Sequence, residues 1–424
     1  MTRSARLLLS ILRSALARAV CSLILMCALM MMGSSLLRAQ TFTVLHNFTG
    51  AADGSVPLGS ITFDAQGNLY GTASAGGHNV NGCVSFGFPG CGTAFKLTRR
   101  SSGWTFSPLY QFQGDSDGAN PYSGVAIGPD GTLYGTTLFG GFGQGTVYNV
   151  RPPARPVGNA LGSWSERVLY AFGNGEDGSY PTFGTVVFDP SGNMYGTTEL
   201  GGYECVDGGY CGTVFKLTPS GGGWTASFFQ FMGGHDGGNP LSGVVLDAAG
   251  NLYGTTDIGD YDPVVYQLTP NGSGWTETVL YDLGPFSDPR GGVILDGVGG
   301  LYGTDVGGLV YQLSPPGGSW IYSLLYSFSG SSGPWNGVVR DASGNLYGTT
   351  CGDGTHGHGS VFKLMPSGDT WTETDLYDFT GGIDGDCPIG GIARDASGNL
   401  FGTTMDGGSG CGAAGCGVIW EITP

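Results

Sequence analysis

The chain has 424 residues and a formal net charge of −17, from 16 basic and 33 acidic side chains. This acidic balance argues against nucleic acid and anionic membranes as partners, because both are bound through cationic surfaces. Glycine is abundant, at 83 residues, and only 12% of residues are charged. Such a composition indicates disorder unless the glycines recur with a period, so their spacing decides the class of protein.

The first 39 residues have the features of a secretory signal peptide. Basic residues, among them Arg3 and Arg18, precede the apolar run Ala19–Met32, and the small residue Ala39 stands at the expected cleavage site. A membrane anchor is the alternative. We expect cleavage and a secreted, periplasmic or cell-surface location in a bacterium, with no membrane association afterwards. Removing residues 1–39 takes away five arginines and no acidic residue, so the net charge falls from −17 to −22.

A six-residue pattern organises residues 40–424, which we expect to form one domain. Residues 67–72 read GNLYGT, and six variants of this pattern follow. The later copies are Gly131–Thr136, Gly192–Thr197, Gly250–Thr255, Gly299–Thr304, Gly344–Thr349 and Gly398–Thr403. A period of this length is typical of solenoids, propellers and other repeat architectures.

The clearest unit, residues 241–283, predicts four antiparallel strands. The expected strands are Gly243–Asp247, Leu252–Thr256, Val264–Leu268 and Trp275–Leu283. β-branched and aromatic residues dominate each run, and turn residues separate the runs. Gly250 suits the positive φ that a tight turn requires.

Seven such units predict an all-β, seven-bladed β-propeller, because a single four-stranded sheet cannot bury both faces alone. A glycine also recurs shortly after a proline where each first strand begins, as in Pro240 and Gly243. Innermost strands converge on the propeller axis, where side chains would crowd. A two-sheet sandwich and a solenoid are the competing architectures.

The two ends of the repeat region predict how the ring closes. Residues 41–48, TFTVLHNF, match the fourth-strand pattern TETDLYDF of residues 372–379. The last segment, Gly417–Thr423, has the pattern of a third strand. We therefore expect the N-terminal strand to pair into the last blade, which removes an open sheet edge.

The unit resembles the GloVer-type tandem repeat of exported bacterial proteins. The resemblance rests on the GNLYGTT core at Gly250–Thr256, the strand GTVFKLTP at Gly212–Pro219, Trp371, and the LYDF ending at Leu376–Phe379. It covers nearly the whole repeat region. The resemblance implies an exported repeat protein, and it brings no activity and no catalytic residues to carry over.

Eight cysteines follow residue 39 and are predicted to form disulfides. Three pairs each share a loop, and the remaining two cysteines fall in neighbouring loops. The pairs are Cys83 and Cys91, Cys205 and Cys211, Cys411 and Cys416, and Cys351 and Cys387. Paired cysteines in an exported chain are typical of disulfides. A zinc site is the alternative, but the C-x2-C spacing is absent from the sequence.

Variable loops join the predicted strands at one face of the propeller, where binding usually resides. An aspartate followed by glycine recurs in the loops between blades, at Asp53, Asp117, Asp177, Asp236 and Asp384. A ring of carboxylates suggests a cation or polyol site, whereas the favoured alternative is that each aspartate caps its own turn. No calcium-loop pattern is complete, so we predict no cofactor and leave calcium as the alternative.

Four further residues are candidate ligand-binding residues. Trp335 and Asn336 lie in a blade-joining loop, outside the register of the repeated tryptophans. If exposed, Trp335 is the best candidate for a platform on which sugars stack. Arg340 and Arg394 end first strands, where other blades have apolar residues. They suit an anionic group, although pairing with the aspartates that follow them is the favoured interpretation.

These features predict a binding or scaffolding module whose ligand is an extracellular glycan or protein. One alternative is a hydrolase or lyase that acts on polysaccharide, with loop carboxylates as its acid/base pair. Another is a purely structural surface protein. The sequence contains no nucleophile-elbow motif around a candidate serine, so the prediction leans away from an enzyme.

Overall fold

The computed structural model describes residues 40–424, except residues 79–81, 154–162, 174, 206–208, 258–262, 273, 316–318 and 331. The predicted signal peptide, residues 1–39, lies outside the described residues. Residues 42–423 form one compact unit. No helix in the described part of the chain is long and apolar enough to cross a membrane.

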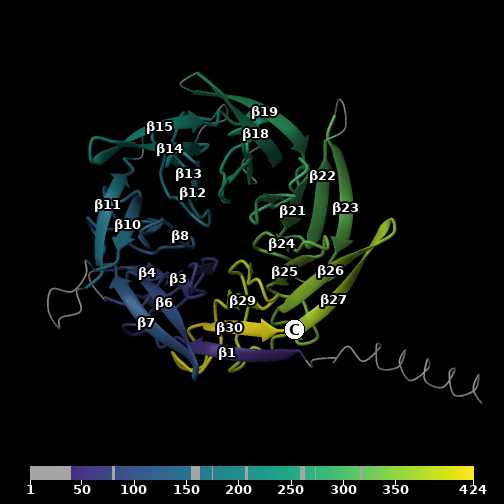
Figure 1. The fold of residues 1–424 in the computed structure, drawn as a ribbon. Coiled ribbons are helices and arrows are strands. Elements are labelled where there is room, and N and C mark those ends of the chain that lie inside the picture. Colours follow the sequence, from purple (N-terminus) through teal and green to yellow (C-terminus); the bar gives the residue numbers. More distant parts are fainter. Residues whose placement is uncertain are drawn as a thin grey trace, which may run out of the picture. The chain divides into compact units, whose positions relative to one another are not determined.

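The compact unit is a seven-bladed β-propeller, as the sequence predicts. Its strands form seven four-stranded antiparallel sheets arranged in a ring (Figure 1). The innermost strands are β2 (Thr62–Phe63), β8 (Ala126–Ile127), β12 (Val187–Phe188), β16 (Val245–Leu246), β20 (Val293–Leu295), β24 (Val339–Arg340) and β28 (Ala393–Arg394). The second strands are β3 (Leu69–Ala73), β9 (Leu133–Thr137), β13 (Met194–Thr198), β17 (Leu252–Thr255), β21 (Leu301–Asp305), β25 (Leu346–Thr350) and β29 (Leu400–Thr403).

The outer half of each blade is a long hairpin. The third strands are β6 (Thr93–Arg100), β10 (Thr146–Arg151), β14 (Thr213–Ser220), β18 (Val264–Asn271), β22 (Leu309–Ser314), β26 (Ser360–Ser367) and β30 (Val418–Thr423). The outermost strands are β7 (Gly103–Gln111), β11 (Ser165–Ala171), β15 (Gly223–Gln230), β19 (Gly274–Asp282), β23 (Ile321–Ser327), β27 (Thr370–Asp378) and β1 (Thr41–Asn47). Outside the blades lie the hairpin of β4 (Val84–Ser85) and β5 (Phe88–Pro89), and a 3-10 turn, η1 (Gly234–Asp236).

The innermost strands are shorter than predicted because their backbones approach one another. A Cβ atom added to Gly184 would lie 2.5 Å from the Cα atom of Gly243 in the next blade. One added to Gly59 would lie 2.6 Å from the backbone nitrogen of Gly124. Glycine is therefore required where the inner strands converge, as the sequence predicts.

At the second glycine of the GNLYGT pattern, an aromatic ring from the third strand packs directly against the backbone. Gly254 pairs with Tyr266, and a Cβ atom on Gly254 would lie 2.4 Å from the tyrosine oxygen. The same pairing recurs in every blade, at Gly71–Phe95, Gly135–Tyr148, Gly196–Phe215, Gly303–Tyr311, Gly348–Phe362 and Gly402–Trp420. All seven rings are buried, so the pattern encodes the core of each blade.

In six of the seven blades, an aspartate three residues before the GNLYGT pattern caps the turn between the first two strands. The Asp247 carboxylate accepts hydrogen bonds from the backbone and side-chain nitrogens of Asn251 and from the Tyr253 hydroxyl. Burial acts to raise the pKa of Asp247, but these hydrogen bonds outweigh it and hold the pKa below its ordinary value. Asp64, Asp189 and Asp341 make the same contacts.

The repeated tryptophans join neighbouring blades. Trp275 of β19 packs edge-on against Tyr195 of the preceding blade, with ring centroids 6.4 Å apart. Trp104, Trp224 and Trp371 make the same contact with the preceding blade. This arrangement confirms that the repeated tryptophans serve blade packing.

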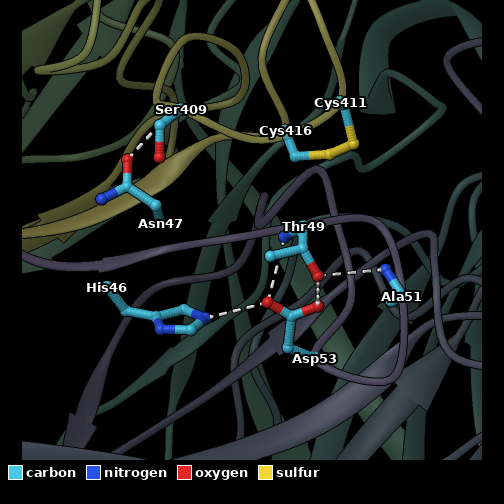
Figure 2. Close-up of a disulfide and its surroundings, with 8 residues drawn as sticks. All are labelled: His46, Asn47, Thr49, Ala51, Asp53, Ser409, Cys411 and Cys416. Atoms are coloured by element: carbon cyan, nitrogen blue, oxygen red, sulfur yellow. Dashed lines mark hydrogen bonds and ion pairs between the residues drawn. A yellow bond between two sulfur atoms is a disulfide. The ribbon is translucent and has the colours of Figure 1, made fainter.

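The N-terminal strand closes the ring, as predicted. Strand β1 pairs with β30, and the Phe48 N–H donates to the Gly417 carbonyl at 3.2 Å. The Phe42 ring stacks on Tyr377 of the sixth blade, with centroids 3.7 Å apart. The Ser409 N–H also donates to the Asn47 side-chain oxygen, which ties the end of β1 to the last blade (Figure 2).

Four disulfides join the cysteine pairs predicted from the sequence: Cys83–Cys91, Cys205–Cys211, Cys351–Cys387 and Cys411–Cys416. Three of them staple a loop within one blade, whereas Cys351–Cys387 links the sixth blade to the seventh. Disulfides persist in oxidising compartments, so this set favours an extracellular or periplasmic location.

Candidate functional site

The strand order places two kinds of connection on opposite faces of the propeller. The loop-rich face carries the loops that follow each second strand and the loops that join blades. The turn face carries the aspartate-capped turns and the tips of the outer hairpins. All four disulfides lie on the loop-rich face.

Exposed apolar side chains gather on loops of the loop-rich face. Phe142 is 78% exposed and Phe286 is 94% exposed. Others on this face are Val84, Phe86, Phe139, Tyr203, Tyr210, Met232 and Ile383. Elsewhere in the described part of the chain, Val298 is exposed on the turn face, Ile321 at an outer hairpin tip, and Val279 and Leu324 on outer strands. Exposed apolar groups mark interaction surfaces, so the loop-rich face is the better candidate.

The carboxylates of the five predicted aspartates accept hydrogen bonds from residues close to them in the chain. Asp117 accepts a hydrogen bond from the Tyr110 hydroxyl at 2.8 Å and from the Gln113 backbone nitrogen. Asp53 accepts from His46 and from the Thr49 backbone (Figure 2). Asp177 and Asp384 bind a tyrosine hydroxyl and a backbone nitrogen in the same way, and Asp236 binds a backbone nitrogen. This geometry matches the turn-capping interpretation.

Arg340 and Arg394 lie on the turn face, away from the other candidates. Each is exposed and is the last residue of an innermost strand, directly before the capped turn. The Arg340 guanidinium lies over the Tyr302 ring at 5.9 Å, and that of Arg394 over Tyr347 at 5.7 Å. Within the described residues, neither forms the ion pair with the following aspartate that the sequence favours. They instead cover the edge of the preceding blade.

A cavity of about 290 Å³ lies among the innermost segments of the propeller. This volume is near the lower end for ligand pockets and suits a single small unit such as one sugar. Its lining combines valine and isoleucine side chains with polar and aromatic groups. The latter are Ser60, Phe183, Thr185, Ser242, Arg290 and Asn336. None of the five aspartates discussed above lines this cavity.

Arg290 is the one charged residue in the cavity lining. Its Nε atom donates to both carboxylate oxygens of Asp288, at 2.8 and 3.0 Å, and its guanidinium lies over the Trp335 ring at 4.9 Å. Burial acts to lower the pKa of Arg290, but Asp288, Asp257 and Glu199 outweigh it and raise that pKa. The guanidinium is therefore held as a rigid cation. Its terminal nitrogens have no hydrogen-bond acceptor in the described part of the chain.

The predicted pair Trp335 and Asn336 reaches this site, but Trp335 is not the open platform envisaged. It is half-buried, its indole N–H donates to the Ser332 hydroxyl at 2.7 Å, and Arg290 covers one ring face. Trp335 therefore orients Arg290. Asn336 lines the cavity and donates to the Ile389 carbonyl at 3.4 Å.

Sequence reasoning missed Arg290, although a signal for it exists. The residue after the proline that opens an innermost segment is Leu58, Tyr122, Leu241, Trp335 or Ile389 in five other blades. Arg290 occupies this position in the fifth blade, where it breaks an otherwise uncharged series. Comparing the repeats position by position would have identified it.

Two half-buried carboxylates also lie close together elsewhere, at the junction of the last two blades. Asp386 pairs with His358 at 3.0 Å, and Asp386 and Asp406 are bridged through their backbones. Burial, helped by the charge of Asp386, raises the pKa of Asp406 to about 6. Neither aspartate lines the cavity, so the acid/base pair of the hydrolase alternative is not formed there. No group of three metal ligands occurs in the described residues.

Glu277 provides a prediction about pH. Burial, helped by the charge of Asp236, raises the pKa of Glu277 to about 8, and one carboxylate oxygen is buried without a partner. A raised carboxyl pKa destabilises the fold as pH rises from about 4.5 towards 8, because the unfolded chain ionises first. At pH 8 the free energy of unfolding, measured with urea, should therefore be higher for Glu277→Gln than for the wild type. The expected difference is about 1 kcal/mol after allowance for solvent screening.

The two proteins should have the same stability near pH 4.5, where Glu277 is neutral in both folded and unfolded states. Glu176→Gln, which changes an exposed loop glutamate, is the matched control and should show no such difference. Equal stabilities of Glu277→Gln and wild type across this pH range would show that Glu277 ionises freely in the folded protein.

Comparison with known families matches residues 83–308 and 303–424 to the Gloeobacter/Verrucomicrobia repeat. Comparison with curated proteins yields no match. Among solved structures, the extracellular domain of a protein described as a one component system from B. thetaiotaomicron aligns with a TM-score of 0.52 and 12% identity. The alignment covers 89% of this chain, which spans 40% of that chain.

Two further structures align with lower scores. A protein described as a 6-phosphogluconolactonase from Bacteroides fragilis gives a TM-score of 0.47 at 14% identity, over 87% of this chain and 88% of that chain. A gluconolactonase from Xanthomonas campestris gives 0.41 at 13% identity, over 91% and 90%. At these identities the first structure shows a shared fold alone, and the other two carry no inference about this chain.

Proposed function

Because the chain belongs to the Gloeobacter/Verrucomicrobia repeat family, whose repeat builds the blades, we propose that its function resides where the blades differ. The protein is an exported binding module, directed out of the cell by residues 1–39. It takes one unit of an extracellular, uncharged glycan into the cavity at Arg290, with the loop-rich face as the surrounding binding surface.

The single observation that carries this proposal is the arrangement of Arg290. Its guanidinium is fixed by Asp288 and Trp335, while its terminal N–H groups lack acceptors within the described residues. Asn336, Ser242 and other lining groups add hydroxyl and amide partners to the same cavity. A sugar ring presents several hydroxyls and an apolar face, so it matches this mixture of donors, acceptors and aliphatic side chains.

The charge of the site favours a neutral ligand. The Arg290 cation is balanced by Asp288 and lies near Asp257 and Glu199, and the whole chain is strongly acidic. An acidic polymer would meet this excess of negative charge at every approach. The size of the cavity, about 290 Å³, suits one sugar rather than a folded protein segment.

Binding to a glycan array, with variants of the cavity, tests the proposal. The wild type should bind neutral glycans, and Arg290→Lys should weaken binding about tenfold, because a lysine loses the planar set of donors. Asn336→Ala should weaken binding to a smaller extent. Arg340→Ala, on the turn face, is the matched control and should bind as the wild type does.

A wild-type protein that binds no glycan on the array would contradict the proposal and leave the protein-binding and structural alternatives. Binding that survives unchanged in Arg290→Lys and Asn336→Ala would place the glycan outside the cavity. Melting curves of each variant show whether a loss of binding reflects a loss of fold.

A further inference from the structure

One loop of the loop-rich face contains a two-stranded hairpin, the one sheet outside the blades among the residues that the structure describes. Strands β4 and β5 follow the second strand of the first blade, and the Cys83–Cys91 disulfide closes the segment that contains them. The register pairs Ser85 with Phe88, so Phe86 and Gly87 form a two-residue turn.

The residue at the tip is poorly suited to its conformation. Phe86 has a φ of 50° and Gly87 a φ of 84°, the pattern of a turn in which both central residues are left-handed. Asparagine followed by glycine suits such a turn, whereas a bulky side chain is a genuine outlier there. Phe86 is nevertheless 49% exposed, so packing in the core does not explain its presence. Strained residues of this kind cluster at binding sites.

The Phe86 ring begins a series of three rings that reaches the cavity. Its centroid lies 5.8 Å from that of Tyr122, with the planes inclined by 28°. The Tyr122 centroid lies 5.7 Å from that of Phe183, with the planes inclined by 39°. Phe183 lines the cavity that holds Arg290. The three rings come from the first, second and third blades, so only the folded propeller brings them together.

Hydrogen bonds hold the middle of this series in place. The buried Ser85 hydroxyl lies 2.8 Å from that of Ser74 and donates to the Tyr122 hydroxyl at 3.3 Å. The base of the hairpin packs through Phe88 against buried residues near the cavity, including Leu58 and Ile389. The hairpin, the tyrosine and the cavity therefore form one connected unit.

We propose that Phe86, Tyr122 and Phe183 form an aromatic track on which a linear, neutral oligosaccharide lies, with its end in the cavity at Arg290. This inference rests on the proposed function and extends it from one sugar to a chain. Sugar rings stack their apolar C–H faces on aromatic rings, and the spacing of the three rings is close to the length of one residue in an extended sugar chain.

Chain-length dependence tests the track. Affinities of cello- and manno-oligosaccharides, from monosaccharide to hexasaccharide, are measured by calorimetry for the wild type and Phe86→Asn. Asparagine suits the turn, so this variant should keep or improve the melting temperature while it removes the ring. We expect wild-type affinity to rise with length, and Phe86→Asn to lose about fivefold for the longest chain and nothing for the monosaccharide.

Two further variants separate the track from the rest of the face. Phe142→Ala removes a ring that is 78% exposed on another loop of this face, and should bind chains of every length as the wild type does. Tyr122→Phe keeps the middle ring and should retain most of the gain with length. Arg290→Lys should weaken binding at every length.

The outcomes distinguish the two proposals. A gain with length that persists in Phe86→Asn, or the absence of any gain in the wild type, would overturn the track while cavity binding stands. No binding of any glycan by the wild type would overturn the proposed function and the track with it. A loss in Phe86→Asn confined to the longer chains would support the track.

Discussion

Deleting Gln40–Phe48 should unfold the propeller rather than merely trim one edge. The deletion removes β1, exposes the edge of β30 and uncovers Trp420, which is fully buried. Phe48 is itself fully buried, and Phe42 stacks on Tyr377. Losing this burial should cost about 5 kcal/mol or more, a large part of the stability of a typical domain. Circular dichroism melting curves measure the loss directly.

Adding the missing strand as a synthetic peptide provides the control. A peptide with the sequence of residues 40–48 should raise the melting temperature of the truncated protein in proportion to the logarithm of its concentration, because it binds only the folded ring. A peptide with the same composition in scrambled order should have no effect. An unchanged melting curve for the truncated protein would show that the ring does not depend on this strand.

Gly254→Val should strongly destabilise the fold. A Cβ atom at this position would lie 2.4 Å from the oxygen and 2.6 Å from the Cζ atom of Tyr266, which is fully buried. The ring has no free space to enter, so the fold must shift, at a cost of about 3 kcal/mol or more. Urea unfolding of wild type and variant measures the difference.

Gly250→Ala is the matched control, since this glycine lies in the capped turn of the same blade. It has a φ of 88°, and an added Cβ atom would meet nothing closer than 3.8 Å. The control should therefore cost about 1 kcal/mol, from backbone strain alone. The double variant Gly254→Val/Tyr266→Leu should lose less than the sum of the losses of its two single variants, because both changes act on one contact. Strict additivity would contradict the proposed packing.

The architecture of the protein could be predicted from its sequence because the repeat carries it at several levels. The pairing of Gly254 with Tyr266, the cap at Asp247 and the tryptophan contact at Trp275 each recur in register. Ring closure followed from the matching patterns of the two ends. The lengths of the innermost strands were overestimated, because crowding at the axis depends on neighbouring blades and not on the residues of one strand.

The candidate site was much less predictable, because it consists of departures from the repeat. Trp335 and Asn336 were identified for that reason, but the cover of Arg290 over the Trp335 ring depends on a contact between two blades. The recurring aspartates attracted attention by their number, and their repetition in fact reflects turn capping. Phe86 gave no signal, since a phenylalanine before glycine does not suggest a left-handed hairpin turn.

A crystal structure of the protein with the longest neutral oligosaccharide that it binds would test the central claim most directly. We predict a sugar residue in the cavity, in hydrogen-bond contact with Arg290 and Asn336, and further residues passing over Phe183 and Tyr122 towards Phe86. An oligosaccharide seated on the turn face, or on the outer strands of the blades, would contradict the claim that the loop-rich face is the binding surface.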